Sequence, residues 1–338
     1  MIFGLFGGAQ ANATNGGEGQ GFRDYIEFNI EADALGYHSA FLVEHHFTGW
    51  TQVSATLNLL TWLAARTQTL RVGTAVMVLP WHNPVLLAEQ AATLDLLSGG
   101  RLDLGIGKGY RHTEFTGFCV PPAEAEARFD ETLDVMIKAW TSVERFSHKG
   151  RFWQFENIVV EPPSAQKPHP PLWMAAGSVE SIRKVAERGC NLLLDQFAQP
   201  EVIGERIAQF KNEVEARGRI FNPMSVAVAR DVYIARDAAD KSAALERNAR
   251  MRQRTIDAAR APGQSRGSHV LAYTESASGN EAAALYGNPD EVARKLEMLQ
   301  SVGVNYILAS MGGGSRDSLR RFARELAPTF AAPGDGRA

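Results

Sequence analysis

Short runs of hydrophobic residues alternate along the chain with longer segments in which hydrophobic positions recur every three or four residues. The short runs are rich in Val, Ile and Leu and predict strands buried on both faces, whereas the longer segments predict amphipathic helices. The predicted strands cover residues 2–6, 39–43, 70–79, 102–106, 172–175, 191–195, 225–235 and 305–309. The predicted helices cover residues 22–35, 54–66, 84–97, 122–146, 178–188, 201–217, 238–260, 289–302 and 315–327.

This repeated alternation predicts an α/β fold, a (β/α)₈ TIM barrel, with insertions after strands four and seven. We expect a single barrel domain over residues 1–330 and a C-terminal tail at 331–338. After strand four, residues 149–161 predict a small β excursion, and a proline-rich connector follows. After strand seven, residues 262–288 contain few large apolar residues and predict a long functional or mobile loop. An open doubly wound sheet is the alternative architecture.

Composition and charge limit the partners of the protein. Its 338 residues are 45% hydrophobic and 22% charged, which is ordinary for a globular protein. The formal net charge of -3 argues against nucleic acid and anionic membranes as partners. We expect neither a membrane span nor a signal peptide, because the apolar runs are too short. Cys119 and Cys190 form no Cys-x-x-Cys motif, so a reduced, cytoplasmic setting is expected.

In a barrel of this kind, functional residues lie at the C-terminal ends of the strands. Strand two ends in Glu44-His45-His46-Phe47, and a histidine there suits acid–base chemistry at neutral pH. One histidine is expected to face the barrel mouth while its neighbour packs behind it. A metal site that includes His82 or Asp103 is a second interpretation, although adjacent histidines are poor joint ligands. A structural histidine paired with Glu44 is the third.

Two neighbouring strand ends have the features of phosphate-binding sites. After strand four, residues 107–111 combine glycines, which let the backbone approach a ligand, with the cations Lys108 and Arg111. A tight turn with solvated cations explains this segment equally well. After strand five, Ser178 and Ser181 lie at the start of a predicted helix, where free amides and hydroxyls bind anions. Plain helix capping is the alternative there. Together the two segments favour a phosphorylated cofactor.

Taken in order, these segments resemble the bacterial luciferase-like flavin-dependent monooxygenases. The resemblance covers residues 2–330 and is carried by residues 44–47, 72–80 with 83–84, 98–109, 176–178 with Ser181, and 287–292. It implies a barrel that binds FMN, with reduced FMN supplied by a separate flavin reductase. It further implies that reduced FMN and O₂ oxidise a small organic substrate. A homodimer that associates through the helices after strands two and three is also implied.

The resemblance assigns individual residues. His45 matches the family's catalytic histidine, beside Glu44, and the Ala75–Val76 bond matches a non-proline cis peptide that lies against the flavin ring. Lys108 sits where the family places a cation on the phosphate. The expected cofactor-binding residues are Ala75, Val76, Lys108, Gly109, Tyr110, Ala176, Gly177, Ser178 and Ser181.

Two positions depart from the family pattern. The reactive cysteine of the light-emitting luciferase subunit is Gly107 here, and a glutamate that precedes the phosphate-binding serine is Gly177. We therefore expect an oxygenase that makes product rather than light. Residues 262–288 match a loop that closes over the flavin and excludes water. An F420-dependent oxidoreductase is a second hypothesis, which the Glu-His-His-Phe motif disfavours. A non-catalytic flavin-binding protein and a metal-dependent hydrolase are the others.

Overall fold

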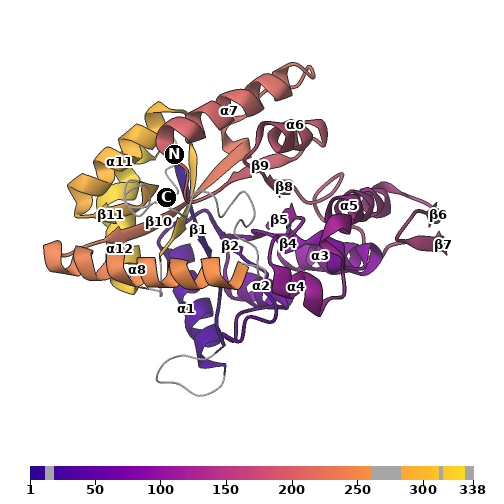
Figure 1. Cartoon of the computed structure of the whole chain (residues 1–338), viewed down its shortest axis with the longest axis horizontal. Helices are drawn as coiled ribbons and strands as arrows, with labels where there is room; N and C mark the ends of the chain where they lie inside the picture. The colour runs from indigo at the N-terminus through magenta and orange to yellow at the C-terminus, as the bar shows by residue number, and fades with distance from the viewer. Residues whose placement is uncertain (12–18, 260–282, 312–314, 332–338) are drawn as a thin grey trace.

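A closed barrel of parallel strands is the centre of the computed structural model, which describes residues 1–11, 19–259, 283–311 and 315–331 (Figure 1). Eight strands of the described chain form the ring, and each pairs with the next. In ring order they are β1 (Ile2–Gly7), β2 (Ser39–Leu42), β3 (Arg71–Thr74), β5 (Leu102–Gly107), β8 (Leu172–Ala175), β9 (Asn191–Leu194), β10 (Val226–Ile234) and β12 (Tyr306–Ser310). Because β9 pairs with β10 and β12 pairs with β1, the sheet closes. The predicted barrel is confirmed, and the open sheet is wrong.

Helices follow the strands and surround the barrel (Figure 1). They are α1 (Gln20–Ala34), α2 (Thr56–Arg66), α3 (Pro84–Leu97), α5 (Ala125–Thr141), α6 (Val179–Glu187), α7 (Pro200–Glu215), α8 (Ala238–Ala259), α11 (Pro289–Ser301), α12 (Arg316–Arg321) and α13 (Ala327–Phe330). Their inner faces form one hydrophobic cluster with the outward side chains of the strands, including the buried Leu63, Leu87 and Val185. Burying each side chain of this size contributes roughly 1.5–3 kcal/mol. No helix of the described residues is long and apolar enough to cross a membrane.

The inside of the barrel is filled by side chains. Phe41 and Trp173 pack edge to face with ring centroids 5.8 Å apart, and Tyr306 lies against Trp173 from the other side of the barrel. Gly73 makes room for this layer, because a Cβ at that position would lie 2.8 Å from the Phe41 ring. A filled interior leaves the rims of the barrel as the places where a ligand can bind.

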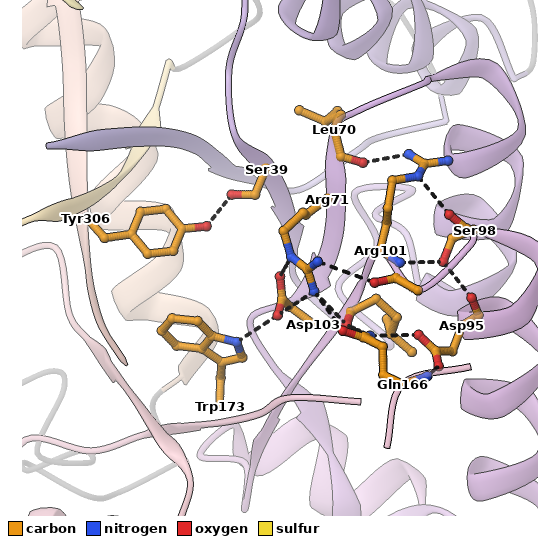
Figure 2. Close-up of polar contacts among 12 residues, drawn as sticks. Ser39, Leu70, Arg71, Asp95, Ser98, Arg101, Asp103, Gln166, Trp173 and Tyr306 are labelled. Atoms are coloured by element: carbon orange, nitrogen blue, oxygen red, sulfur yellow. Dashed lines mark hydrogen bonds and ion pairs between the residues drawn. The ribbon is translucent and has the colours of Figure 1, made fainter. Parts of the chain in front are cut away.

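A polar layer closes the N-terminal end of the barrel (Figure 2). Arg71, the first residue of β3, donates from Nε to Asp103 Oδ2 at 2.6 Å, and Trp173 Nε1 donates to Asp103 Oδ1 at 3.2 Å. Ser39 and Tyr306, the first residues of their strands, share a hydrogen bond of 2.5 Å. Asp103 therefore neutralises Arg71 at the end of the barrel opposite to the predicted site. It is thus too far from His45 and His46 to be a ligand of the metal site that was the second interpretation.

Three local features differ from the predicted elements. The predicted strand at 70–79 is broken into β3 and β4 (Met77–Val78) by the Ala75–Val76 peptide, which is cis as the resemblance implies. A short helix, α4 (His112–Gly117), follows β5 where no element was predicted. A short strand, β11 (Leu285–Gly287), pairs with β10 at the end of the predicted loop 262–288. The rest of that loop, up to residue 282, lies outside the described residues.

The insertion after strand four is confirmed as a hairpin. Strands β6 (Phe146–Lys149) and β7 (Gln154–Ile158) pair antiparallel and form a separate two-stranded sheet. The helix predicted at 122–146 ends earlier, at Thr141, because residue 146 already belongs to β6. Figure 1 shows this hairpin standing away from the barrel, beyond α5.

Candidate active site

Glu44 ties together two loops at the C-terminal rim of the barrel. Its side chain is fully buried just after β2, and its Oε1 accepts hydrogen bonds from His46 Nε2 at 2.9 Å and His82 Nε2 at 2.7 Å. Its Oε2 accepts from the Val78 amide at 2.7 Å. Burial raises the pKa of Glu44, but these three hydrogen bonds together lower it below its ordinary value of 4.5. Glu44 is thus an ionised carboxylate that positions the loops after β2 and β4. His46 and His82 share this one carboxylate, and no metal-binding group of three residues exists among the described residues.

His45 points away from Glu44 and is held by a different acid. Its Nδ1 lies 3.0 Å from Oε1 of Glu114, a buried residue of α4, and the same oxygen accepts from the His46 amide. Because the carboxylate accepts, Nδ1 carries the proton. No residue of the described chain bonds His45 Nε2. The two histidines thus bind different carboxylates, but both side chains are 15% exposed and both line the same pocket, so the structure does not place one behind the other as predicted.

The surroundings of His45 keep its imidazole neutral. Burial lowers the pKa of His45, and the positive charge of Arg111 lowers it further, whereas the hydrogen bond to Glu114 raises it. The net pKa lies below the ordinary value of 6.5. A neutral imidazole with a free Nε2 can accept a proton at pH 7. His45, His46, Phe47 and Gln52 line a pocket of about 220 Å³ beside it, and the buried Oε1 of Gln52 has no partner among the described residues.

Aromatic rings cover the rim next to these histidines. Trp81 and Phe118 stack with centroids 5.2 Å apart, and the His46 ring meets Phe118 edge to face at 4.7 Å. Phe47 packs on Phe118 at 5.0 Å while more than half of its own surface stays exposed. The rim therefore offers an apolar, aromatic surface to a bound organic molecule.

Two glycines, at the end of β5 and just after it, allow close packing at the C-terminal rim. A Cβ added to Gly107 would lie 2.5 Å from Val76 Cγ2, so the Val76 side chain fills the space that a side chain at position 107 would need. Gly109 has a φ of +77°, and a Cβ there would lie 2.8 Å from both Trp81 and Val78. Glycine is needed at both positions. The cis peptide Ala75–Val76 and these two glycines therefore let the segments after β3 and β5 pack closely against each other.

Lys108, the cation predicted to bind a phosphate, forms an ion pair with a carboxylate in this structure. Its Nζ lies 2.5 Å from Glu126 Oε2, and Lys184 binds the other oxygen of Glu126 at 2.6 Å. The hydrogen bond from Lys108 is the largest cause that lowers the pKa of Glu126, to about 2. Lys108 is exposed and flexible enough to exchange this partner for a phosphate.

The start of α6 carries the second predicted phosphate site. Ser178 Oγ accepts from the Ser181 amide at 3.2 Å, and Ser181 Oγ accepts from the Ser178 amide at 3.0 Å. This reciprocal capping is the alternative that the sequence left open. A buried cation lies beside it: the Cβ of a residue replacing Gly177 would lie 3.2 Å from Arg206 Nη2. Sequence reasoning missed Arg206, because it is one polar residue inside an ordinary amphipathic helix, α7. Arg206 Nη1 donates to Asp195 Oδ2 at 2.7 Å, so this cation is paired with a carboxylate within the described chain.

The two cysteines have no place in the chemistry of the described residues. Cys190 is buried, and burial raises the pKa of its thiol to about 12, so it packs as a small apolar side chain. Cys119 is an exposed thiol that follows Phe118 in the loop after α4, and the structure adds no catalytic partner to it.

Comparison with known proteins identifies relatives over most of the chain. The family model described as luciferase-like monooxygenase matches residues 1–306. An uncharacterised protein of Sinorhizobium fredii, y4vJ, is 32% identical over 70% of this chain and 67% of its own. The oxygenase component of a flavin-dependent trigonelline monooxygenase from Acinetobacter baylyi is 29% identical over 70% of this chain and 65% of its own. The chain thus spans about two thirds of the length of these two relatives.

Solved structures share the same barrel. Monooxygenase RslO1 from Streptomyces bottropensis superimposes with a TM-score of 0.83 at 25% identity, covering 98% of this chain and 100% of the other. An F420-dependent secondary alcohol dehydrogenase superimposes with a TM-score of 0.78 at 17% identity, covering 98% and 99%, a likeness of fold alone. The match over residues 1–306 confirms the resemblance inferred from the sequence: the chain belongs to the luciferase-like monooxygenase family.

Proposed function

We propose that this protein is the oxygenase component of a two-component monooxygenase that uses reduced FMN and O₂ to oxidise a small organic substrate. The observation that carries the proposal is His45, a neutral imidazole held by Glu114 through Nδ1, with Nε2 unbonded beside a pocket at the barrel rim. Such a group can take and return a proton while a neighbouring molecule is oxidised. Glu44 acts by positioning, because all its hydrogen bonds go to the loops around His45.

The residues at the rim fit FMN. The phosphate would lie at the start of α6, held by Ser178 and Ser181 and faced by Lys108 and Arg206. Ala75–Val76, Gly109 and the Tyr110 backbone would line one face of the ring, and Ala176 and Gly177 would line the turn between ring and phosphate. Reduced FMN, when bound, supplies the electrons that activate O₂. The name of the Acinetobacter relative, a flavin-dependent oxygenase component, supports a separate reductase. F420 is the competing cofactor, because the same barrel serves an F420-dependent dehydrogenase.

Binding and turnover measurements distinguish these cofactors. Under anaerobic conditions we expect the protein to bind reduced FMN more tightly than reduced F420. With a purified flavin reductase that supplies reduced FMN, the substrate should be oxidised and O₂ consumed. His45→Ala should lower substrate oxidation by about 10²–10⁴-fold while the affinity for reduced FMN changes less than about twofold. Preferential binding of F420, or full turnover in His45→Ala, contradicts the proposal. A protein that binds FMN without substrate-dependent O₂ consumption would be a non-catalytic flavin carrier.

We also propose that the protein is a cytoplasmic homodimer. The outer faces of α2 and α3, which pack side by side, carry large apolar side chains that the chain itself leaves uncovered. Trp62 is 63% exposed, and Leu86 and Leu97 are exposed to a similar degree. A patch of this kind is typical of an interface between subunits. Both cysteines are unpaired, which supports the cytoplasmic setting.

A further inference from the structure

Arg111 is a buried cation whose partner is absent from the described chain. The residue is only 2% exposed, and its Nε and Nη1 atoms are buried without a hydrogen-bond partner among the described residues. Burying a guanidinium without compensating hydrogen bonds is strongly unfavourable. Two other deeply placed arginines have more partners, although Nε of Arg230 is also buried without a hydrogen-bond partner among the described residues. Arg71 binds the carboxylate of Asp103, and both Nη atoms of Arg230 donate to backbone carbonyls. The Nε and Nη1 donors of Arg111 therefore lack an acceptor that a bound molecule would supply.

The guanidinium of Arg111 borders the candidate active site. It lies over the ring of Tyr110, with Cζ 5.8 Å from the centroid, and the Tyr110 ring in turn meets His45 edge to face at 6.5 Å. Its charge is close enough to His45 to lower the pKa of that imidazole. Glu114, the acid three residues further along, forms no ion pair with Arg111 in the described chain, and its Oε1 accepts from His45 and from the His46 amide. An anion bound to Arg111 would thus lie beside the proposed acid–base residue.

We propose that Arg111 binds a carboxylate of the substrate, so that the protein oxidises a small organic acid with an apolar body. This inference rests on the proposed function and names its substrate class. The planar guanidinium matches a carboxylate with two parallel hydrogen bonds, an interaction that a neutral substrate cannot replace. His45 lines a pocket of about 220 Å³ that suits a molecule of about one ring, and Phe47 supplies an aromatic surface at its edge. Arg111 does not line this pocket in the described chain, so the carboxylate would extend from it toward the Tyr110 side of His45. The phosphate of the cofactor is expected at the start of α6 instead.

The first test separates a ligand-binding arginine from a structural one. Arg111→Met removes a buried charge that lacks a partner, so we expect the melting temperature of the ligand-free protein to rise by about 2 °C or more. The control Arg71→Met removes a paired charge and should lower the melting temperature. If Arg111→Met lowers it as Arg71→Met does, Arg111 has a structural partner and the proposal is overturned.

The second test measures binding of carboxylates to the flavin-free protein. Acetate, benzoate, phenylacetate and nicotinate are titrated by calorimetry, with benzamide as the neutral counterpart of benzoate. We expect at least one carboxylate to bind, Arg111→Gln to weaken it at least about tenfold, and Arg111→Lys to weaken it less. Benzamide binding should not depend on Arg111. Arg66→Gln, which removes an exposed charge from α2, is the control for net charge and should have no effect. Equal binding by Arg111→Gln, or no binding of any carboxylate, overturns the proposal.

A third arm identifies the source of the acceptor. The ring of reduced FMN also carries oxygen acceptors, so the affinity for reduced FMN is measured anaerobically in the wild type and in Arg111→Gln. Loss of flavin binding with unchanged carboxylate binding would assign Arg111 to the cofactor and overturn the substrate assignment. If carboxylates bind through Arg111 but reduced FMN does not bind at all, the proposed function fails and the anion site remains. The two failures are therefore distinguishable.

Discussion

His45 is hydrogen-bonded to the buried carboxylate of Glu114 and lies near the buried guanidinium of Arg111, and its protonation depends on both. In the folded protein its pKa is below 6.5, so the unfolded chain binds a proton at a higher pH than the native state does. Stability is therefore lost as the pH falls from 6.5 through the lowered pKa, and so is any activity that needs the neutral imidazole. Because Glu114 raises the pKa of His45 and Arg111 lowers it, the effect of replacing either residue has a predictable direction.

We predict opposite shifts of the His45 pKa in two single variants. Glu114→Gln removes the interaction that raises the pKa and should lower it further, whereas Arg111→Gln removes a repelling charge and should raise it. Titration of the imidazole by NMR measures both without any substrate. Glu114→Gln should also move the acid limb of the activity profile to lower pH. A pKa that moves in the same direction in both variants would contradict this arrangement.

At the scale of the elements, sequence reasoning works where the pattern is long and repeated. The eight strands and the helices around them follow from their hydrophobic periodicity, and the capping residues Asn83 and Asn288 fix two helix starts. Interruptions within a strand and very short helices do not show in the hydrophobic periodicity. The run 70–79 reads as one apolar strand, and α4 has only six residues, too few for a period to appear. Because α4 carries Glu114, the residue that holds His45 could not be found from spacing alone. Arg206 and the burial of Arg111 depend on tertiary packing and leave no local signal either.

The break between β3 and β4 leads to a prediction about Gly107. Gly107→Cys, which restores the cysteine of the light-emitting luciferase subunit, places its Cβ against Val76 Cγ2. We expect a loss of about 1–3 kcal/mol in the free energy of unfolding from this overpacking. Adding Val76→Ala should recover part of the loss. The same substitution at Gly7, where an added Cβ meets no atom within 4 Å, is the control and should be nearly neutral. Urea unfolding measures the three variants and the wild type. Equal losses at Gly7 and Gly107 would show that Val76 is not the obstacle.

At the scale of the whole molecule, the uncovered apolar face of α2 and α3 predicts association. Trp62→Glu places a charge in the centre of this face, where it would be buried without a partner in a dimer. We expect light scattering to give a dimer for the wild type and a monomer for the variant, with the circular dichroism spectrum unchanged. Val143→Glu, at a fully exposed position after α5, is the control and should remain dimeric. A monomeric wild type would contradict the proposed homodimer.

The two ends of the barrel carry separate tasks, and this separation can be tested. The polar layer at the N-terminal end holds the strands together through Arg71 and Asp103 (Figure 2), whereas the C-terminal rim carries His45 and the predicted cofactor residues. Asp103→Asn removes the charge that pairs with Arg71 and should cost about 2–3 kcal/mol in the free energy of unfolding. The filled layer of Phe41 and Trp173 lies between the two ends, so the affinity for reduced FMN and the pKa of His45 should stay unchanged. Glu44→Gln should instead affect the C-terminal rim. It weakens the hydrogen bonds that hold the loops around His45, so the affinity for reduced FMN and the pKa of His45 should change. Urea unfolding, anaerobic flavin titration and NMR of His45 measure the three quantities. If Asp103→Asn changed flavin binding at equal stability, the two ends would be coupled through the core, and the filled interior would not isolate the site.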